Sequence, residues 1–142
     1  MTELQLRKQI IATALRMNAV GINRGKSGNV SARWKGGFLV TPSGLPYEET
    51  KPADIVFIDG KATAKGRRPP SSEWRFHFDL YQRKSEVNAV VHTHSSFATT
   101  LACLGMAVPA FHYMVAVAGG NSIRCAPYAT FGTQTLSDHA LR

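Results

Sequence analysis

Two histidines separated by a single residue carry the clearest chemical signal in this sequence. They lie in residues 90–95, which read VVHTHS, and the β-branched residues of that run indicate a strand. Side chains two positions apart on a strand point to the same face, so His92 and His94 can converge on one metal ion. The alternative interpretation is a pair of hydrogen-bonded surface imidazoles, because this spacing also arises by chance.

Glu73 is the expected third ligand. It follows Ser71 and Ser72, which are the predicted cap of a helix, and the positive end of a helix dipole favours a carboxylate there. Two imidazoles and one carboxylate are typical of an open catalytic site, for which zinc is the first choice and iron, cobalt or manganese are alternatives. A plain acidic residue at a helix start is the competing interpretation.

The remaining histidines are weaker candidates. His77 lies four residues after Glu73, and we expect it to be packed or hydrogen-bonded rather than a ligand. His112 and His139 have no ligand spacing to the pair at positions 92 and 94.

Three short loops can cradle an anion. They contain Gly28 and Asn29, Ser43 and Gly44, and Ser71 and Ser72. Each offers backbone N–H groups or hydroxyls, as phosphate sites do. A net charge of +8 favours an anionic ligand. The basic residues are scattered, and their densest cluster, in residues 61–68, contains no aromatic residue, so we expect a small phosphorylated metabolite rather than nucleic acid.

These residues need a mixed α/β scaffold. Helical periodicity predicts a first helix, with a capping box from Thr2 to Gln5, ending between positions 18 and 21. Alternation predicts strands over 29–34 and 38–41 joined at Gly36-Gly37, and another over 54–58. A helix is expected to about Lys84, then a strand over 89–93 and a helix from position 95 or 96 to near 105. Further predictions are a strand over 123–125 and a last helix starting near Thr135.

The size of the chain favours one domain. It has 142 residues, with 44% apolar and 18% charged residues, which suits a globular protein. Cys103 and Cys125 form no CxxC pair and are expected to be reduced and buried, as in a cytoplasmic protein. We expect no signal peptide and no membrane-spanning segment.

The ordered set of motifs resembles the class II aldolase/adducin family. The motifs are SGNVS at 27–31, TPSG at 41–44, SSE at 71–73 and HTH at 92–94, followed by HY at 112–113, AGGNSI at 118–123 and CAPYATFG at 125–132. The resemblance spans essentially the whole chain, so residues 1–142 are expected to form one domain of this type.

The resemblance implies a fold and a reaction. The fold would be a three-layer α/β/α domain with a largely antiparallel sheet. A zinc ion held by Glu73, His92, His94 and one further histidine would assist cleavage of L-fuculose 1-phosphate, or a similar ketose 1-phosphate, to dihydroxyacetone phosphate and L-lactaldehyde. A pentulose-phosphate 4-epimerase and a non-catalytic adducin-like module are the alternatives.

The resemblance also implies roles for individual residues. Glu73 would act as the base as well as a metal ligand, and Tyr113 would act in a site at a subunit boundary of a homotetramer. The substrate phosphate would lie among residues at three loops: Gly28, Asn29, Ser43, Gly44, Ser71 and Ser72.

The family's fourth histidine belongs to a His-His-Gly motif expected downstream of Arg142. We therefore expect a C-terminally truncated domain that lacks the family's last strand and helices. Such a chain is expected to be poorly stable alone, because a sheet edge and apolar surface would be uncovered.

Overall fold

One antiparallel sheet organises the chain. The computed structural model describes residues 1–142, apart from the side chain of Ala118. The strands follow the order β4-β3-β2-β1-β5 across the sheet, and every neighbouring pair is antiparallel. Their bounds are Asn29–Trp34 (β1), Gly37–Val40 (β2), Val56–Asp59 (β3), Ala64–Lys65 (β4) and Ala89–His92 (β5). The helices are α1 (Glu3–Ala19), η1 (Pro52–Asp54), α2 (Trp74–Arg83), α3 (Ser96–Cys103), η2 (Tyr113–Ala118) and α4 (Gln134–Ala140).

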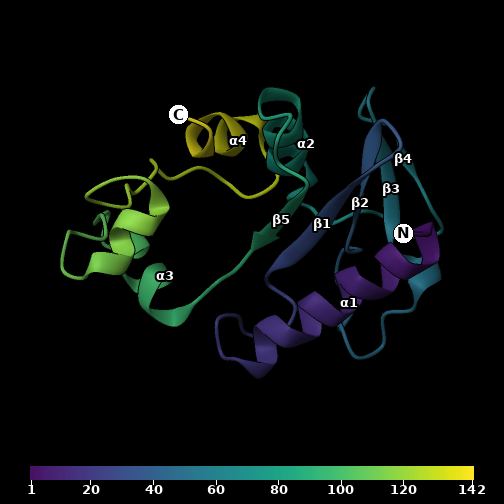
Figure 1. Ribbon diagram of the computed structural model, residues 1–142, viewed down its shortest axis with the longest axis horizontal. Helices are drawn as coiled ribbons and strands as arrows, with labels where there is room; N and C mark the ends of the chain where they lie inside the picture. Colours follow the sequence, from purple (N-terminus) through teal and green to yellow (C-terminus); the bar gives the residue numbers. More distant parts are fainter.

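Helix α1 covers one face of the sheet (Figure 1). Its capping box from Thr2 to Gln5 is formed as predicted, and one side of the helix is buried. The apolar core on this face consists of Ile10, Ala14, Met17, Val30, Ala32, Leu39, Tyr47 and Ile55. Alternation along the strands places every second side chain here, so the pattern of period two in the sequence determines which residues pack on α1.

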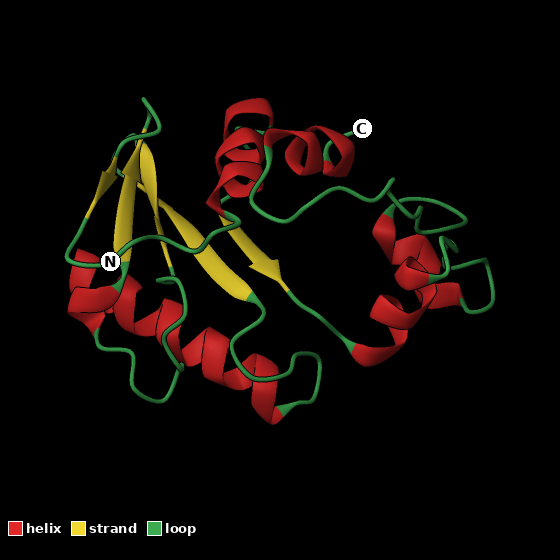
Figure 2. Cartoon of the chain, turned by 180° about the vertical axis from the view of Figure 1, so that it is seen from behind, coloured by secondary structure: helices red, strands yellow, loops and turns green.

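Helix α2 covers the opposite face (Figure 2). Its Tyr81 packs with Phe38, Val40, Val56 and Ile58 of the sheet, and the Phe38 and Tyr81 ring centroids are 5.0 Å apart. Arg33 donates to the carbonyls of Tyr81 and Lys84, which ties the end of α2 to β1. The expected three layers, helix on sheet on helix, are therefore confirmed.

Residues 96–131 lie away from the sheet. Figures 1 and 2 both show α3 and η2 to one side, connected to β5 through residues 93–95. The chain then returns, and α4 packs on α2, where Asp79 accepts hydrogen bonds from Ser137 Oγ and Gln134 Nε2, each at 2.6 Å. No helix among the described residues is long and apolar enough to cross a membrane.

Several sequence predictions need correction. The hairpin turn is centred on Lys35 and Gly36, both at positive φ, rather than on Gly36-Gly37. Helix α4 is capped by Thr133, earlier than expected. Ile123 forms only an isolated bridge with Val108 instead of a strand. Cys103 and Cys125 are unpaired, as expected, but neither is buried: Cys125 is partly exposed, and Cys103 is exposed because α3 packs on little else.

The start of α2 also differs from the prediction. Glu73 itself is the N-cap residue of the helix, and neither Ser71 nor Ser72 occupies that position. Ser71 instead accepts a hydrogen bond from the Glu73 N–H at 3.3 Å. Ser71 thus holds the carboxylate-bearing residue just outside the first turn.

Candidate metal and substrate site

Strand register brings the proposed ligands together. Asn29 of β1 lies directly opposite His92 of β5, and both side chains are on the face covered by α2. His92 Nε2 is 3.3 Å from Glu73 Oε2 and 2.9 Å from His94 Nε2. One ligand atom from each of Glu73, His92 and His94 lies within 4.8 Å of the others. A carboxylate and two imidazoles this close fit an open divalent-metal site.

The local electrostatics favour the metal-binding protonation states. Burial by itself would raise the pKa of Glu73, but interaction with His92 and the hydrogen bond from Asn29 hold it below its ordinary value. Burial, reinforced by the charge of His92, lowers the pKa of His94. A carboxylate and a neutral imidazole are the forms that bind a metal, so both pKa shifts favour the forms of Glu73 and His94 that can bind a cation.

Asn23 and Gly28 fix the position of the segment that carries His92 and His94. The buried side chain of Asn23 accepts a hydrogen bond from the His94 N–H at 3.0 Å. A Cβ on Gly28 would lie 2.5 Å from the His92 carbonyl oxygen and 2.7 Å from Asn23 Oδ1. Only glycine allows the loop to approach β5 this closely, because it has no Cβ.

The three predicted phosphate loops meet at one end of the sheet. The Ser71 N–H donates to the Thr41 carbonyl and the Ser43 N–H to the Pro69 carbonyl, which joins the loop after β2 to the loop before α2. Lys26 Nζ donates to the Gly44 carbonyl at 2.9 Å and joins the loop before β1 to them. Ser43, Gly44 and Ser72 are exposed, whereas Gly28, Asn29 and Ser71 are buried.

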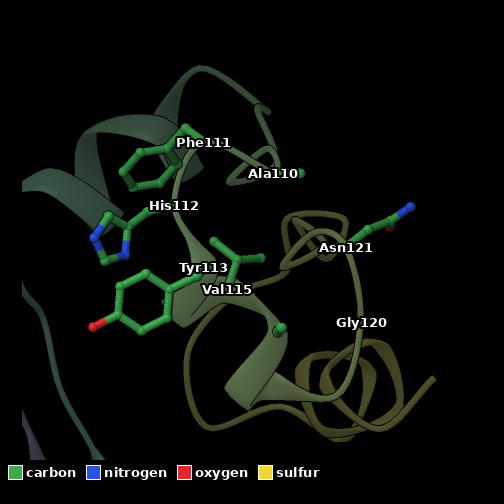
Figure 3. Close-up of a pocket in the computed structure, with 8 residues that line it drawn as sticks. Ala110, Phe111, His112, Tyr113, Val115, Gly120 and Asn121 are labelled. Atoms are coloured by element: carbon green, nitrogen blue, oxygen red, sulfur yellow. The ribbon is translucent and has the colours of Figure 1, made fainter.

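Tyr113 lies in a different part of the molecule. It begins η2 and is 77% exposed, and it is not among the residues of the metal cluster. Figure 3 shows its ring beside that of His112. With Phe111, these two residues line an open pocket of about 470 Å³. The Tyr113 and His112 ring centroids are 4.4 Å apart. Within a single chain, the structure thus brings together the metal ligands but not Tyr113.

Two residues near the site were not predicted from the sequence. Asn23 supports His94 across 71 positions of sequence, and nothing local marks that contact. Lys26 places a cation beside the phosphate loops, and its position between Gly25 and Gly28 in a glycine-punctuated loop was the available signal.

The chain is similar in sequence and structure to known proteins that are named as aldolases. The chain is 54% identical over 140 residues to a 5-methylthioribulose-1-phosphate/5-deoxyribulose-1-phosphate aldolase of Rhodospirillum rubrum, covering 99% of this chain and 63% of that protein. It is 53% identical over 135 residues to the L-fuculose phosphate aldolase of Escherichia coli K12, covering 95% and 63%. A solved L-fuculose 1-phosphate aldolase superposes with a TM-score of 0.90 at 38% identity, covering 95% and 65%.

The chain spans somewhat less than two thirds of the length of these two curated relatives. The family described as Class II Aldolase and Adducin N-terminal domain matches residues 8–142. That match includes all three proposed metal ligands and all three loops. The chain belongs to the class II aldolase and adducin N-terminal domain family.

Proposed function

We propose that this chain carries the metal site and phosphate site of an aldolase that cleaves a ketose 1-phosphate. The observation that carries the proposal is the convergence of Glu73, His92 and His94 within 4.8 Å. Two groups of relatives, named for L-fuculose phosphate and for 5-deoxyribulose 1-phosphate, are nearly equally similar to the chain. This similarity supports a ketose 1-phosphate as the substrate class, with L-fuculose 1-phosphate as one candidate that would yield dihydroxyacetone phosphate and L-lactaldehyde.

Each group of residues has a proposed role. Glu73, His92 and His94 would hold a divalent ion, with zinc the first choice. A bound ion would supply Lewis acidity toward the substrate carbonyl oxygen. Residues of the three loops, namely Gly28, Asn29, Ser43, Gly44, Ser71 and Ser72, would hold the phosphate and so orient the sugar.

Glu73 and Tyr113 would move the protons. In the cleavage direction, the C4 hydroxyl loses its proton as the C3–C4 bond breaks, and C3 gains one. The Glu73 carboxyl would exchange the proton at C3, and the Tyr113 phenol would exchange the one at the aldehyde oxygen. The exposure of Tyr113 at 77% supports a role in the site of a neighbouring subunit, as in a homotetramer.

A Glu73→Gln variant tests the central assignment. Cleavage is measured by release of dihydroxyacetone phosphate, together with metal content by elemental analysis, with and without a chelator. We expect a loss of turnover of at least about a hundredfold with metal retained, and loss in the wild type on chelation. Glu86→Gln, at an exposed site, is the matched control. Unchanged turnover in Glu73→Gln would contradict the role of Glu73 as the base.

Tyr113→Phe tests the second proton carrier. The variant removes one hydroxyl, and we expect turnover to fall about a hundredfold while metal content stays the same. Tyr128→Phe removes a hydroxyl from a tyrosine that is 91% exposed and should act like the wild type. If both variants keep full activity, Tyr113 has no part in the chemistry.

Two rival functions have their own readouts. A pentulose-phosphate 4-epimerase would use the same metal and phosphate residues, and it would convert its substrate without releasing an aldehyde. A non-catalytic adducin-like module would contain no metal by elemental analysis. The close approach of Glu73, His92 and His94 favours a metal enzyme over the module.

A further inference from the structure

A chain of five buried side chains runs from the core to the metal cluster. Tyr81 Oη and Ser31 Oγ are 2.8 Å apart, and Ser31 Oγ lies 2.7 Å from His77 Nδ1. His77 Nε2 is hydrogen-bonded to Asn29 Oδ1, and Asn29 Nδ2 donates to Glu73 Oε2 at 2.9 Å. Each of the five residues is at most 8% exposed. The ligand Glu73 is therefore connected to the interior through His77.

The direction of these hydrogen bonds follows from the carboxylate end. A carboxylate only accepts, so the amide NH₂ of Asn29 must face Glu73 and its carbonyl oxygen must face His77. That oxygen needs a donor, which places the imidazole proton of His77 on Nε2. A neutral imidazole has one N–H, so Nδ1 accepts from the Ser31 hydroxyl, and Tyr81 donates to Ser31.

Burial supports the neutral state of His77. The ring is fully enclosed, and burial lowers the pKa of His77 to about 3. In the neutral ring, Nδ1 accepts the proton of the Ser31 hydroxyl. Every donor and acceptor in the chain then has a partner, in agreement with the absence of unsatisfied buried side-chain atoms among the described residues.

We propose that His77 is a positioning residue whose Nε2–H tautomer orients the Asn29 amide and, through it, the Glu73 carboxylate toward His92 and His94. The inference rests on the proposed function only in taking Glu73 as a metal ligand. A core histidine that merely filled space would need no polar partner leading to that ligand. Outer partners of this kind commonly change metal affinity by about tenfold or more when they are removed.

The first experiment determines the tautomer without any metal. Long-range ¹H–¹⁵N correlation spectra of the wild-type chain distinguish a protonated Nε2 from a protonated Nδ1 in His77. We expect the proton on Nε2 across neutral pH. A proton on Nδ1 would reverse the chain of hydrogen bonds and overturn the proposal.

The second experiment measures Co²⁺ affinity from the visible absorption of the bound ion. His77→Leu removes the donor to Asn29 and should weaken Co²⁺ binding by about tenfold. His77→Gln can place an amide N–H near the position of Nε2 and should recover most of that loss. Tyr81→Phe removes the far end of the chain and is the control, expected to reduce stability toward denaturant while leaving Co²⁺ affinity unchanged.

The outcomes separate the two proposals. Equal Co²⁺ affinity in His77→Leu and the wild type would overturn the positioning role. If His77→Leu does not fold, the tautomer and the Co²⁺ affinity of His77→Gln decide the matter. A His77→Gln variant that binds Co²⁺ as weakly as a variant lacking the His94 side chain would count against the proposal. A wild-type chain that binds no Co²⁺ but shows the Nε2–H tautomer would support the tautomer assignment and overturn the metal site.

Discussion

At the scale of single residues, Gly28 allows its loop to approach β5 closely. A Cβ there would collide with the His92 carbonyl oxygen at 2.5 Å and with Asn23 Oδ1 at 2.7 Å. We expect Gly28→Ala to lower the free energy of unfolding by about 1–3 kcal/mol and to weaken metal binding, because β5 or the loop must move. Denaturant unfolding and Co²⁺ titration measure the two effects.

A matched glycine separates this steric effect from a general loss of chain flexibility. A Cβ on Gly120 would meet only the Ser122 carbonyl oxygen, at 3.8 Å, so Gly120→Ala should be close to neutral. If Gly28→Ala were equally harmless, the close contact between the loop and β5 would not matter for the site.

The grouping of the proposed ligands could be predicted from the sequence, but the residues that support them could not. His92 and His94 are two residues apart in the sequence, and that spacing was sufficient to pair them, although β5 ends at His92 and His94 lies in the connection that follows. The partners of His77, Ser31 and Asn29, lie 46 and 48 positions away in sequence. Those contacts depend on which face of β1 meets α2, and that is fixed only when the layers pack.

At the scale of elements, Asp54 anchors the basic loop to η1. Its buried carboxylate accepts from the Lys51 N–H at 2.8 Å and pairs with Arg67 at 2.7 Å and Arg68 at 2.6 Å. Burial alone would raise the pKa of Asp54, but the bonds from Arg68, Lys51 and Arg67 lower it from 3.8 to about 2. The densest cluster of basic residues in the sequence is thus partly used inside the protein.

The lowered pKa predicts a specific loss of stability in acid. The pKa of Asp54 is lower in the folded chain than in the unfolded chain. Its contribution to the free energy of unfolding is therefore complete above about pH 4 and is lost as the pH falls through about 2. The two arginines are half exposed, so solvent screening reduces the contribution to about 1 kcal/mol. Denaturant unfolding of Asp54→Asn should show lower stability at pH 7 and a flatter decline between pH 4 and 2, and an unchanged decline would contradict the assignment.

At the scale of the whole molecule, packing is unevenly distributed. Both apolar cores lie between the sheet and the helices α1 and α2 that cover it. In residues 96–131, with Ala118 left aside, Val115 is the only buried hydrophobic side chain. Large apolar side chains of that segment are instead exposed, among them Phe97, Phe111, Tyr113, Val117, Tyr128 and Phe131. A surface of this kind favours association with another protein surface.

This uneven packing predicts two levels of stability in one chain. Amides of β1 and β2 should exchange with solvent only on global unfolding, whereas amides of residues 96–131 should exchange through local opening at low free energy. Leu39→Ala, in the core, should lower the free energy of unfolding by about 2–5 kcal/mol, and Val115→Ala, in the outlying segment, by about 1 kcal/mol or less.

Raising the protein concentration should increase the protection of amides in residues 96–131 from exchange if copies of the chain cover that surface. Equal protection of the two regions at low concentration would mean that the outlying segment is held as firmly as the sheet, and the exposed apolar side chains would then need another explanation.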